Sequence, residues 1–326
     1  MKTYATLGPV CNRVELLQAM LEEGLTGFRL NLSHGSLAGQ RALTDAVQAA
    51  SQAAGREAEL IIDLRGPELR CGPLARPMPL AEGAYVTLGR DIPLEADILA
   101  AIGPGQSILL DDGALELTAA ERCPDGIRCQ VERGGVLGSR KSITLPGVEL
   151  PRPALCAQDR EDLRHAAQQG VTAVMQPFVR SRRELDEVRA ALAELGLGRL
   201  TLFAKVEEEQ GWRGLEGWMD GCDVVTIARG DLGSSLGLLR LPGAQKDLAA
   251  RCRAAGKPFL VVTQLLDSMT HRPLPSRAEL LDVYNAVLDG ASALMLTGET
   301  AGGDYPLEAV RWLLRIAQQA ETEKGR

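Results

Sequence analysis

The sequence predicts an α/β protein, a (β/α)8 TIM barrel with a small β domain inserted after its third strand. Short β-branched or apolar runs alternate along the chain with longer stretches of helical spacing, which is typical of βα units around a parallel sheet. Eight such runs occur, and 326 residues are enough for one barrel and an insertion. One long stretch departs from the alternation, and it marks the insertion.

The expected strands and helices follow one another with the rhythm of a closed barrel. Strands are expected over residues 2–7, 26–30, 59–63, 173–176, 200–204, 223–228, 259–262 and 293–296. Helical spacing runs over residues 13–23, 37–54, 182–195, 241–255, 276–289 and 306 to about 321. A helix after each of eight strands is the arrangement of a (β/α)8 barrel.

The departure lies between about residues 71 and 153. Glycine and proline punctuate short alternating runs there, such as AYVTL and GIRCQVE, which favours small antiparallel strands. An unstructured loop of this length would be unusual. We therefore predict a barrel domain of residues 1–70 and 154–326, and an inserted β-barrel-like domain of residues 71–153 that acts as a lid over the barrel mouth.

Composition narrows the class of function. With 36 basic and 43 acidic residues the net charge is −7, and no block of like charges indicates a nucleic-acid partner. The sequence shows neither a signal peptide nor an apolar stretch long enough to span a bilayer, so we expect a cytoplasmic protein without membrane partners. Seven scattered cysteines without a CxxC pair indicate neither disulfides nor a zinc site.

Polar side chains lie in the last residues of six expected strands, or directly after them, at the end where barrel enzymes build their sites. These stretches begin at Arg29, Asp63, Lys205, Ala228, Thr263 and Thr297. A single charged residue after a strand usually marks only the return of the chain to water. Six at the same end of a barrel indicate a site.

The residue types favour phosphate chemistry. Glu207 and Asp231 supply two carboxylates from adjacent strands, a set that suits Mg2+ completed by substrate oxygens and water. Lys205 and Arg29 add positive charge beside them, and phosphoryl transfer depends mostly on positioning and charge neutralisation. Because Lys205 and Glu207 are two residues apart in an extended segment, their side chains face the same way. GGVLGSRKS is no P-loop, since Arg140 stands where that motif needs glycine.

Nine motifs carry a resemblance to a known family. They are FRLNLSHG (28–35), DLRGPELR (63–70), LLDDG (109–113), GGVLGSRK (134–141), AKVEE (204–208), ARGDLG (228–233), VTQLLDSM (262–269), PSRAE (275–279) and LTGETAGGDYPLEAV (296–310). In this order they resemble the motifs of pyruvate kinase, over nearly the whole chain. The resemblance implies a glycolytic kinase that transfers the phosphoryl group of phosphoenolpyruvate to ADP, giving pyruvate and ATP.

The resemblance also implies roles for individual residues in the transfer. Glu207 and Asp231 would hold Mg2+ or Mn2+. Lys205 would stabilise the phosphoryl group in transit, and Arg29 would bind it. The backbone of Gly230 and Asp231 would face the substrate carboxylate.

Three further sets follow from the same motifs. Thr263 would lie near the methylene carbon that is protonated to give pyruvate. A monovalent cation, K+, would be bound by Asn31, Ser33, Asp63 and the carbonyl of Leu64. The nucleotide would be bound by Asn31, His34, Arg70 and Lys141.

Some positions depart from the family pattern. Pro177, Ala204, Glu208 and Tyr284 replace residues that the family usually has around the pocket. At the cation site Leu64 and Arg65 are unusual, whereas Glu68 matches the potassium-dependent members. The chain also ends where the family's C-terminal regulatory domain would begin. We therefore expect no regulation by sugar phosphates, and a homodimer, if any, through the barrel.

Three hypotheses remain open. The chain is an active, unregulated pyruvate kinase; or it is a paralogue that uses the same Mg2+-enolate site on another 2-oxo acid or phosphate donor in a specialised pathway; or it is a catalytically silent binding protein. The complete set of site residues favours the first. The four changed pocket positions motivate the second.

Overall fold

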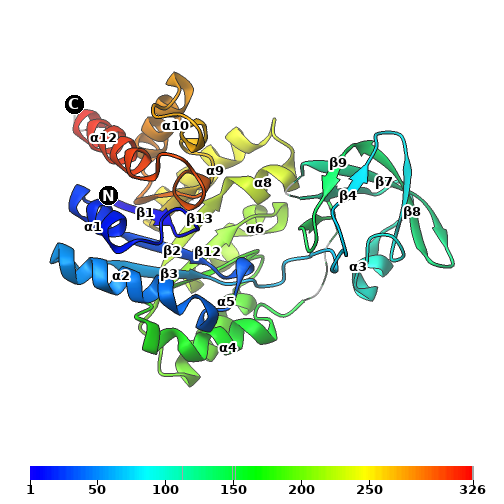
Figure 1. The fold of residues 1–326 in the computed structure, drawn as a ribbon, viewed down its shortest axis with the longest axis horizontal. Helices are drawn as coiled ribbons and strands as arrows, with labels where there is room; N and C mark the ends of the chain where they lie inside the picture. Colours follow the sequence, from blue (N-terminus) through cyan, green and yellow to red (C-terminus); the bar gives the residue numbers. More distant parts are fainter. Residues whose placement is uncertain (112, 149, 151, 325–326) are drawn as a thin grey trace. The chain divides into compact units, whose positions relative to one another are not determined.

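The computed structural model describes residues 1–111, 113–148, 150 and 152–324 (Figure 1). These residues form two compact units. The first comprises residues 1–66, 154–229 and 242–326, and the second comprises residues 67–153 and 230–241. The domain boundaries expected at 70/71 and 153/154 stay a prediction.

Eight parallel strands close into a barrel in the first unit, which confirms the predicted fold class. They are β1 (Lys2–Thr6), β2 (Gly27–Asn31), β3 (Glu59–Asp63), β11 (Ala173–Gln176), β12 (Thr201–Val206), β13 (Val224–Ala228), β14 (Phe259–Val262) and β15 (Ala293–Leu296). The barrel closes through β1 and β15, with Lys2 paired to Ala293. Each strand lies within two residues of its expected range.

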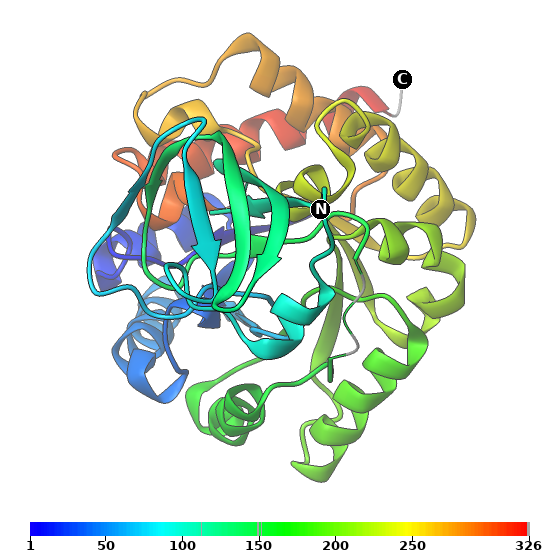
Figure 2. The same cartoon turned by 90° about the vertical axis from the view of Figure 1, so that its right-hand side faces the viewer.

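Helices surround these strands as a ring (Figure 2). They are α1 (Val14–Glu23), α2 (Arg41–Ala54), α4 (Ala157–Ala166), α5 (Arg182–Glu194), α6 (Glu209–Arg213), α7 (Leu215–Trp218), α9 (Leu241–Ala254), α10 (Arg277–Leu288), α11 (Gly298–Ala301) and α12 (Pro306–Lys324). Short 3₁₀ helices lie between them: η1 (Leu32–His34), η2 (Ala38–Gln40), η3 (Ala167–Gln169), η4 (Met219–Gly221) and η5 (Asp267–Thr270). Helix α8 (Arg229–Leu236) begins directly after β13, and its residues beyond Arg229 belong to the second unit. The last helix returns to the first strand, where the amino terminus lies 3.2 Å from Glu321 of α12.

The helix ends follow from local sequence. At α10 the Ser276 hydroxyl accepts a hydrogen bond from the Glu279 N–H, and the Glu279 carboxylate accepts one from the Ser276 N–H. This reciprocal capping satisfies two donors that the helix itself leaves unpaired. Helix α1 ends at Gly24, whose φ of 115° lies in the left-handed region that glycine adopts without strain.

Strand alternation builds the barrel core and, above it, the candidate site. Tyr4, Ile61 and Phe203 are fully or almost fully buried members of one apolar cluster inside the barrel. Side chains two residues apart on a strand share a face. The next inward positions on the same three strands are therefore Thr6, Asp63 and Lys205, at the carboxyl-terminal ends. The two-residue alternation that places apolar side chains in the core thus also places polar side chains at the barrel mouth.

The second unit is mainly antiparallel β-structure. A five-stranded sheet has the order β10-β6-β7-β8-β5, and a separate pair joins β4 and β9. The strands are β4 (Met78–Leu80), β5 (Tyr85–Leu88), β6 (Ser107–Leu110), β7 (Leu115–Cys123), β8 (Gly126–Arg133), β9 (Gly135–Leu137) and β10 (Ile143–Thr144). The sequence interpretation missed the six-residue helix α3 (Ala96–Ala101), because a helix this short depends on tertiary burial, here of Ile98.

Within the described part of the chain, none of the helices combines the length and apolar character that crossing a bilayer requires.

Candidate active site

Four charged side chains meet at the carboxyl-terminal ends of neighbouring strands. Asp63 Oδ2 accepts hydrogen bonds from Arg29 Nη2 at 2.5 Å, Arg29 Nε at 2.8 Å and Lys205 Nζ at 3.2 Å. Lys205 Nζ also lies 2.8 Å from Glu207 Oε1. The set formed by Arg29, Asp63, Lys205 and Glu207, termed here the charge quartet, carries two positive and two negative groups. It is therefore neutral as a whole.

Burial makes this arrangement energetically significant. The Asp63 and Glu207 side chains are each 1% exposed, and those of Arg29 and Lys205 are 11% exposed. Removing one partner of a buried ion pair typically costs about 3–5 kcal/mol, because the other charge stays buried and uncompensated. The quartet therefore keeps two cations at the end of the barrel that would otherwise be costly to hold there.

Thr6 orients the first of these cations. Its hydroxyl donates to the Leu296 carbonyl at 2.8 Å and accepts a hydrogen bond from Arg29 Nη1 at 3.2 Å. The Thr6 hydroxyl and the Asp63 carboxylate thus both fix the orientation of the Arg29 guanidinium. The sequence interpretation gave Thr6 no role, because a threonine at the end of an apolar strand looks like core. Its inward position two residues beyond Tyr4 was the available signal.

Lys205 lies inside β12, not after it. The expected strand ended at Ala204, whereas β12 continues to Val206. Lys205 is therefore held by strand pairing, with Thr226 of β13 as its neighbour in the register. The ion pair between Lys205 and Glu207 confirms that the two side chains lie on the same side.

Glu207 has the properties expected of a metal ligand. Its Oε2 accepts the Phe178 N–H at 2.8 Å, whereas its buried Oε1 has the Lys205 ammonium at 2.8 Å and no other partner within the described residues. Phe178 adopts a φ of 51°, which is uncommon for a residue other than glycine and turns its N–H toward the carboxylate. A buried carboxylate oxygen whose described partner is this ammonium alone can also serve as a ligand of a divalent cation.

Asp231 and Gly230 lie in the first turn of α8, which begins directly after β13. Both belong to the second unit by their contacts. Their pairing with Glu207 in one magnesium site stays a prediction. Among the described residues no cluster of three or more His, Cys, Asp or Glu side chains is arranged as a metal site. A magnesium ion in a kinase needs only one or two carboxylates, with substrate and water supplying the rest.

Thr263 follows β14 in an unusual backbone conformation. Its φ is 80° and that of Gln264 is 54°. A β-branched side chain in the left-handed region is a genuine outlier, and such positions cost about 1–3 kcal/mol each and cluster at functional sites. The guanidinium of Arg229 binds the carbonyls of both residues. The sequence interpretation noted Arg229 only as a polar residue at a strand end.

Two of the four predicted monovalent cation residues are neighbours in the sheet. Asn31 and Asp63 are directly paired between β2 and β3. The Asn31 side chain accepts the Ser33 N–H at 3.0 Å and so caps η1. The N–H of Leu64 donates to the Met175 carbonyl, and this bond fixes the peptide next to Asp63. Because Asp63 already pairs with Arg29 and Lys205, its part in a potassium site stays a prediction.

The predicted nucleotide residues divide between the two units. Arg70 pairs with Glu68 at 2.8 Å and donates to the Arg140 carbonyl, and Lys141 pairs with Asp111 at 2.7 Å, all within the second unit. That these residues join Asn31 and His34 of the barrel in one nucleotide site stays a prediction. In the LLDDG motif, position 112 lies outside the described residues.

The four positions that depart from the family pattern do not share one environment. Ala204 is fully buried in β12, and Glu208 is the N-cap residue of α6. Pro177 packs beside Gly66, where a Cβ would come within 2.6 Å of its ring. Tyr284, by contrast, hydrogen-bonds from α10 to Glu323 of α12 in the helical layer. Tyr284 is thus explained by helix packing.

The seven cysteines are all free thiols in the structure. Burial raises the pKa of Cys222 to about 12 and that of Cys11 to about 11. Thiols with such pKa values are almost entirely protonated at neutral pH and are poor nucleophiles. They are structural residues.

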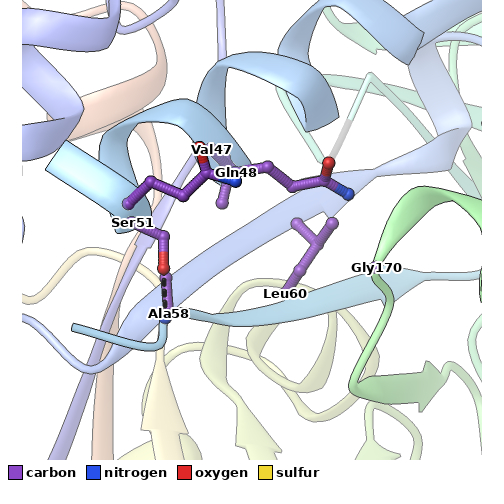
Figure 3. A pocket seen from close by; sticks show the side chains of 7 residues that line it. Val47, Gln48, Ser51, Ala58, Leu60 and Gly170 are labelled. Atoms are coloured by element: carbon purple, nitrogen blue, oxygen red, sulfur yellow. Dashed lines mark hydrogen bonds between the residues drawn. The ribbon is translucent and has the colours of Figure 1, made fainter. Parts of the chain in front are cut away.

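A surface cavity of about 210 Å³ lies elsewhere on the barrel unit (Figure 3). It is lined by residues of α2, by Ala58 and Leu60 at the start of β3, and by Gly170 just before β11. These are the amino-terminal ends of the strands, opposite to the charge quartet. Active sites of barrel enzymes lie at the carboxyl-terminal ends, so this cavity is not the candidate site.

Comparison with known proteins identifies the family. The family model described as "Pyruvate kinase, barrel domain" matches residues 1–310. The chain belongs to the pyruvate kinase family. Similar proteins include human pyruvate kinase PKLR at 38% identity, and the pyruvate kinases of Aeropyrum pernix and Agrobacterium vitis at 37% each.

The match covers nearly all of this chain but only part of each pyruvate kinase. It includes 97%, 98% and 99% of this chain, and 59%, 70% and 68% of the human, Aeropyrum and Agrobacterium proteins, respectively. The family assignment therefore rests on the barrel and on the inserted β unit.

Proposed function

We propose that this chain is a cytoplasmic phosphotransferase that transfers the phosphoryl group of phosphoenolpyruvate to ADP, giving pyruvate and ATP. The observation that carries the proposal is the charge quartet, in which Arg29 and Lys205 are held almost buried at the mouth of a barrel of this family. Two fixed cations are the groups that phosphoryl transfer needs, because the moving group spreads its negative charge over three oxygens.

Arg29 binds the phosphoryl group of the substrate, and Lys205 stabilises it during transfer. Both side chains are oriented before substrate arrives, Arg29 by Thr6 and Asp63, and Lys205 by Asp63 and Glu207. Preorganised charges in a site that excludes water stabilise a transition state without having to reorient. Asp63 offsets the repulsion between the two cations while the site is empty of substrate.

A divalent cation, Mg2+ or Mn2+, fits Glu207 and Asp231. Glu207 offers a buried oxygen whose partner among the described residues is the Lys205 ammonium alone, and Asp231 is the next carboxylate along the chain after β13. When bound, such an ion supplies charge neutralisation for the substrate oxygens and a template for their orientation. The backbone of Gly230 and Asp231 faces the substrate carboxylate in this proposal.

Thr263 moves or relays the proton that converts the enol to pyruvate. Its side chain is partly exposed at the end of β14, and its hydroxyl makes no hydrogen bond within the part of the chain that the structure describes. The hydroxyl is thus available to a ligand. Potassium bound by Asn31, Ser33, Asp63 and the Leu64 carbonyl, and ADP bound by Asn31, His34, Arg70 and Lys141, complete the proposal.

The experiment is a coupled assay with phosphoenolpyruvate, ADP, Mg2+ and K+. We expect turnover that is lost in Arg29→Gln, whereas Arg41→Gln, which breaks an exposed ion pair with Asp45, keeps it. No turnover in the wild-type chain, together with no binding of phosphoenolpyruvate or oxalate, would contradict the enzyme proposal and favour a silent binding protein.

A second candidate is the same chemistry on another 2-oxo acid. It is motivated by Pro177, which departs from the residue type usual in the family and directly precedes Phe178, whose N–H holds Glu207. A panel of phosphorylated enols and 2-oxo acids separates the two. A substrate that exceeds phosphoenolpyruvate in kcat/KM would support this candidate, and a clear preference for phosphoenolpyruvate would reject it.

We also propose that two copies associate through the barrel. Leu281 and Leu288 are seven residues apart on α10, hence on one face of the helix, and are 60% and 37% exposed. Light scattering of the wild-type chain and of Leu281→Glu tests this, since a dimer that depends on α10 would dissociate in the variant. An unchanged mass would contradict it.

A further inference from the structure

The segment after β14 holds two consecutive residues in a conformation that neither side chain favours. Thr263 and Gln264 both have positive φ values, 80° and 54°. Without restraint, a threonine leaves this region for the extended one. Something in the structure must therefore hold the turn.

Arg229 provides that restraint. Its Nε and Nη2 donate to the Thr263 carbonyl at 3.0 and 2.7 Å, and Nη2 also donates to the Gln264 carbonyl at 2.8 Å. The third nitrogen, Nη1, lies 2.6 Å from Asp282 Oδ2 of α10. The planar guanidinium presents fixed donors in a fork, which a lysine ammonium cannot reproduce. One side chain, 10% exposed, thus fixes both strained peptides to a helix.

The turn is also held on its far side. Leu265 and Leu266 are fully buried, and the Leu266 N–H donates to the buried Glu299 carboxylate at 2.9 Å. Glu299 holds the chain after the turn, and Arg229 holds the turn itself. Because the Thr263 hydroxyl makes no hydrogen bond with any described residue, only the backbone decides where it points.

We propose that Arg229, anchored by Asp282, is a positioning residue that holds the Thr263–Gln264 peptides in the left-handed conformation and thereby aims the Thr263 hydroxyl at the reacting carbon. The proposal rests on the proposed function for the role of Thr263. It assigns to Arg229 no contact with substrate. The residue acts only through the backbone that it holds.

A double-mutant cycle tests the coupling. Arg229→Lys keeps the charge but loses the fork, and Thr263→Val removes the hydroxyl. We expect Arg229→Lys to lower kcat about 10- to 100-fold, as small misplacements of catalytic groups do, with KM for phosphoenolpyruvate within about threefold. When Thr263→Val is already present, adding Arg229→Lys should lower kcat further by less than about threefold. Fully multiplicative losses would overturn the proposal.

The proton step provides an independent readout. Exchange of the pyruvate methyl hydrogens in D2O, followed by NMR with ATP, Mg2+ and K+ present, should fall in Arg229→Lys by the same factor as kcat. Arg251→Lys is the matched control, because Arg251 also bridges backbone carbonyls, those of Trp212 and Arg213, to carboxylates. It should leave exchange unchanged, and an equal loss there would contradict a specific role.

A crystal structure of Arg229→Lys separates this proposal from the proposed function. We expect Thr263 to return to a negative φ, and a retained positive φ would overturn the proposal even if the wild-type chain turned out to be inactive. Absence of turnover in the wild type would refute the function alone. Should Arg229→Lys not fold, Asp282→Asn keeps the guanidinium and removes its anchor. It should lower kcat about three- to tenfold, and an unchanged kcat would contradict the account.

Discussion

Replacing Asp63 with asparagine tests the charge quartet most sharply. The change keeps the shape of the side chain but leaves Arg29 and Lys205 with Glu207 as their only partner in the quartet, so that the group acquires a net positive charge. Asp63 is 1% exposed and lies 2.5 Å from Arg29 and 3.2 Å from Lys205. Loss of one member of a buried ion pair costs about 3–5 kcal/mol. We expect Asp63→Asn to lose about that much free energy of unfolding.

The measurement is urea unfolding followed by tryptophan fluorescence. Trp212, Trp218 and Trp312 all lie in the barrel unit, so the signal reports on that unit and not on the second. The loss should appear as a lower midpoint at an unchanged slope. The matched control is Asp45→Asn, whose carboxylate is 59% exposed and lies 3.7 Å from Arg41. An exposed pair contributes about 0–1 kcal/mol.

Two results would refute this reasoning. One is a loss below about 1 kcal/mol in Asp63→Asn, which would mean that the cations do not need the carboxylate. The other concerns the double variant Asp63→Asn/Lys205→Met, in which one cation and one anion are both removed. It should be more stable than the sum of the single losses predicts, because the charges balance again. Strict additivity would show that the two side chains do not interact.

Three further predictions follow from the structure. Gly66→Ala should lower the free energy of unfolding by about 1–3 kcal/mol, because Gly66 has a φ of 57° and a Cβ there would meet the Pro177 ring. The loss should appear as a lower melting temperature, and an unchanged melting temperature would show that the added Cβ causes no strain. Burial opposes ionisation of Glu279, but hydrogen bonds from Ser268 and Ser276 outweigh it and lower its pKa from 4.5. The stability that these bonds add is full above pH 4.5 and falls as the pH drops below it, so the difference between wild type and Glu279→Gln should shrink in acid, and a constant difference would refute this. Burial also raises the pKa values of five thiols to about 11 or 12, so a disulfide reagent at pH 8 should label at most two of the seven cysteines in the native chain, and labelling of three or more would contradict the structure. The five are Cys11, Cys71, Cys129, Cys222 and Cys252.

Sequence patterns were sufficient for the barrel because its signals are local. Apolar runs between helical stretches predicted all eight strands, and the period of two predicted that Lys205 and Glu207 face the same way, as their ion pair shows. The expected strand ended at Ala204, whereas pairing with β13 extends β12 to Val206. A prediction from side-chain polarity alone therefore made the strand that contains Lys205 too short at its carboxyl-terminal end.

The contacts that organise the site depend on long-range packing and could not be predicted in this way. Thr6 and Arg29 are 23 residues apart, and Arg229 and Thr263 are 34 apart. Each pair meets only because neighbouring strands end at the same rim. Phe178 and Thr263 adopt left-handed backbone conformations without being glycine, so the sequence contains no signal that predicts these turns. These features became visible only in the folded chain.

The central claim is that Lys205 stabilises a phosphoryl group transferred from phosphoenolpyruvate. The most direct measurement compares pyruvate formation by the wild-type chain and by Lys205→Met, with phosphoenolpyruvate, ADP, Mg2+ and K+ at saturation. The account predicts turnover in the wild type and a loss of at least about 100-fold in kcat for the variant, with phosphoenolpyruvate still bound. Equal turnover by the two proteins would contradict it.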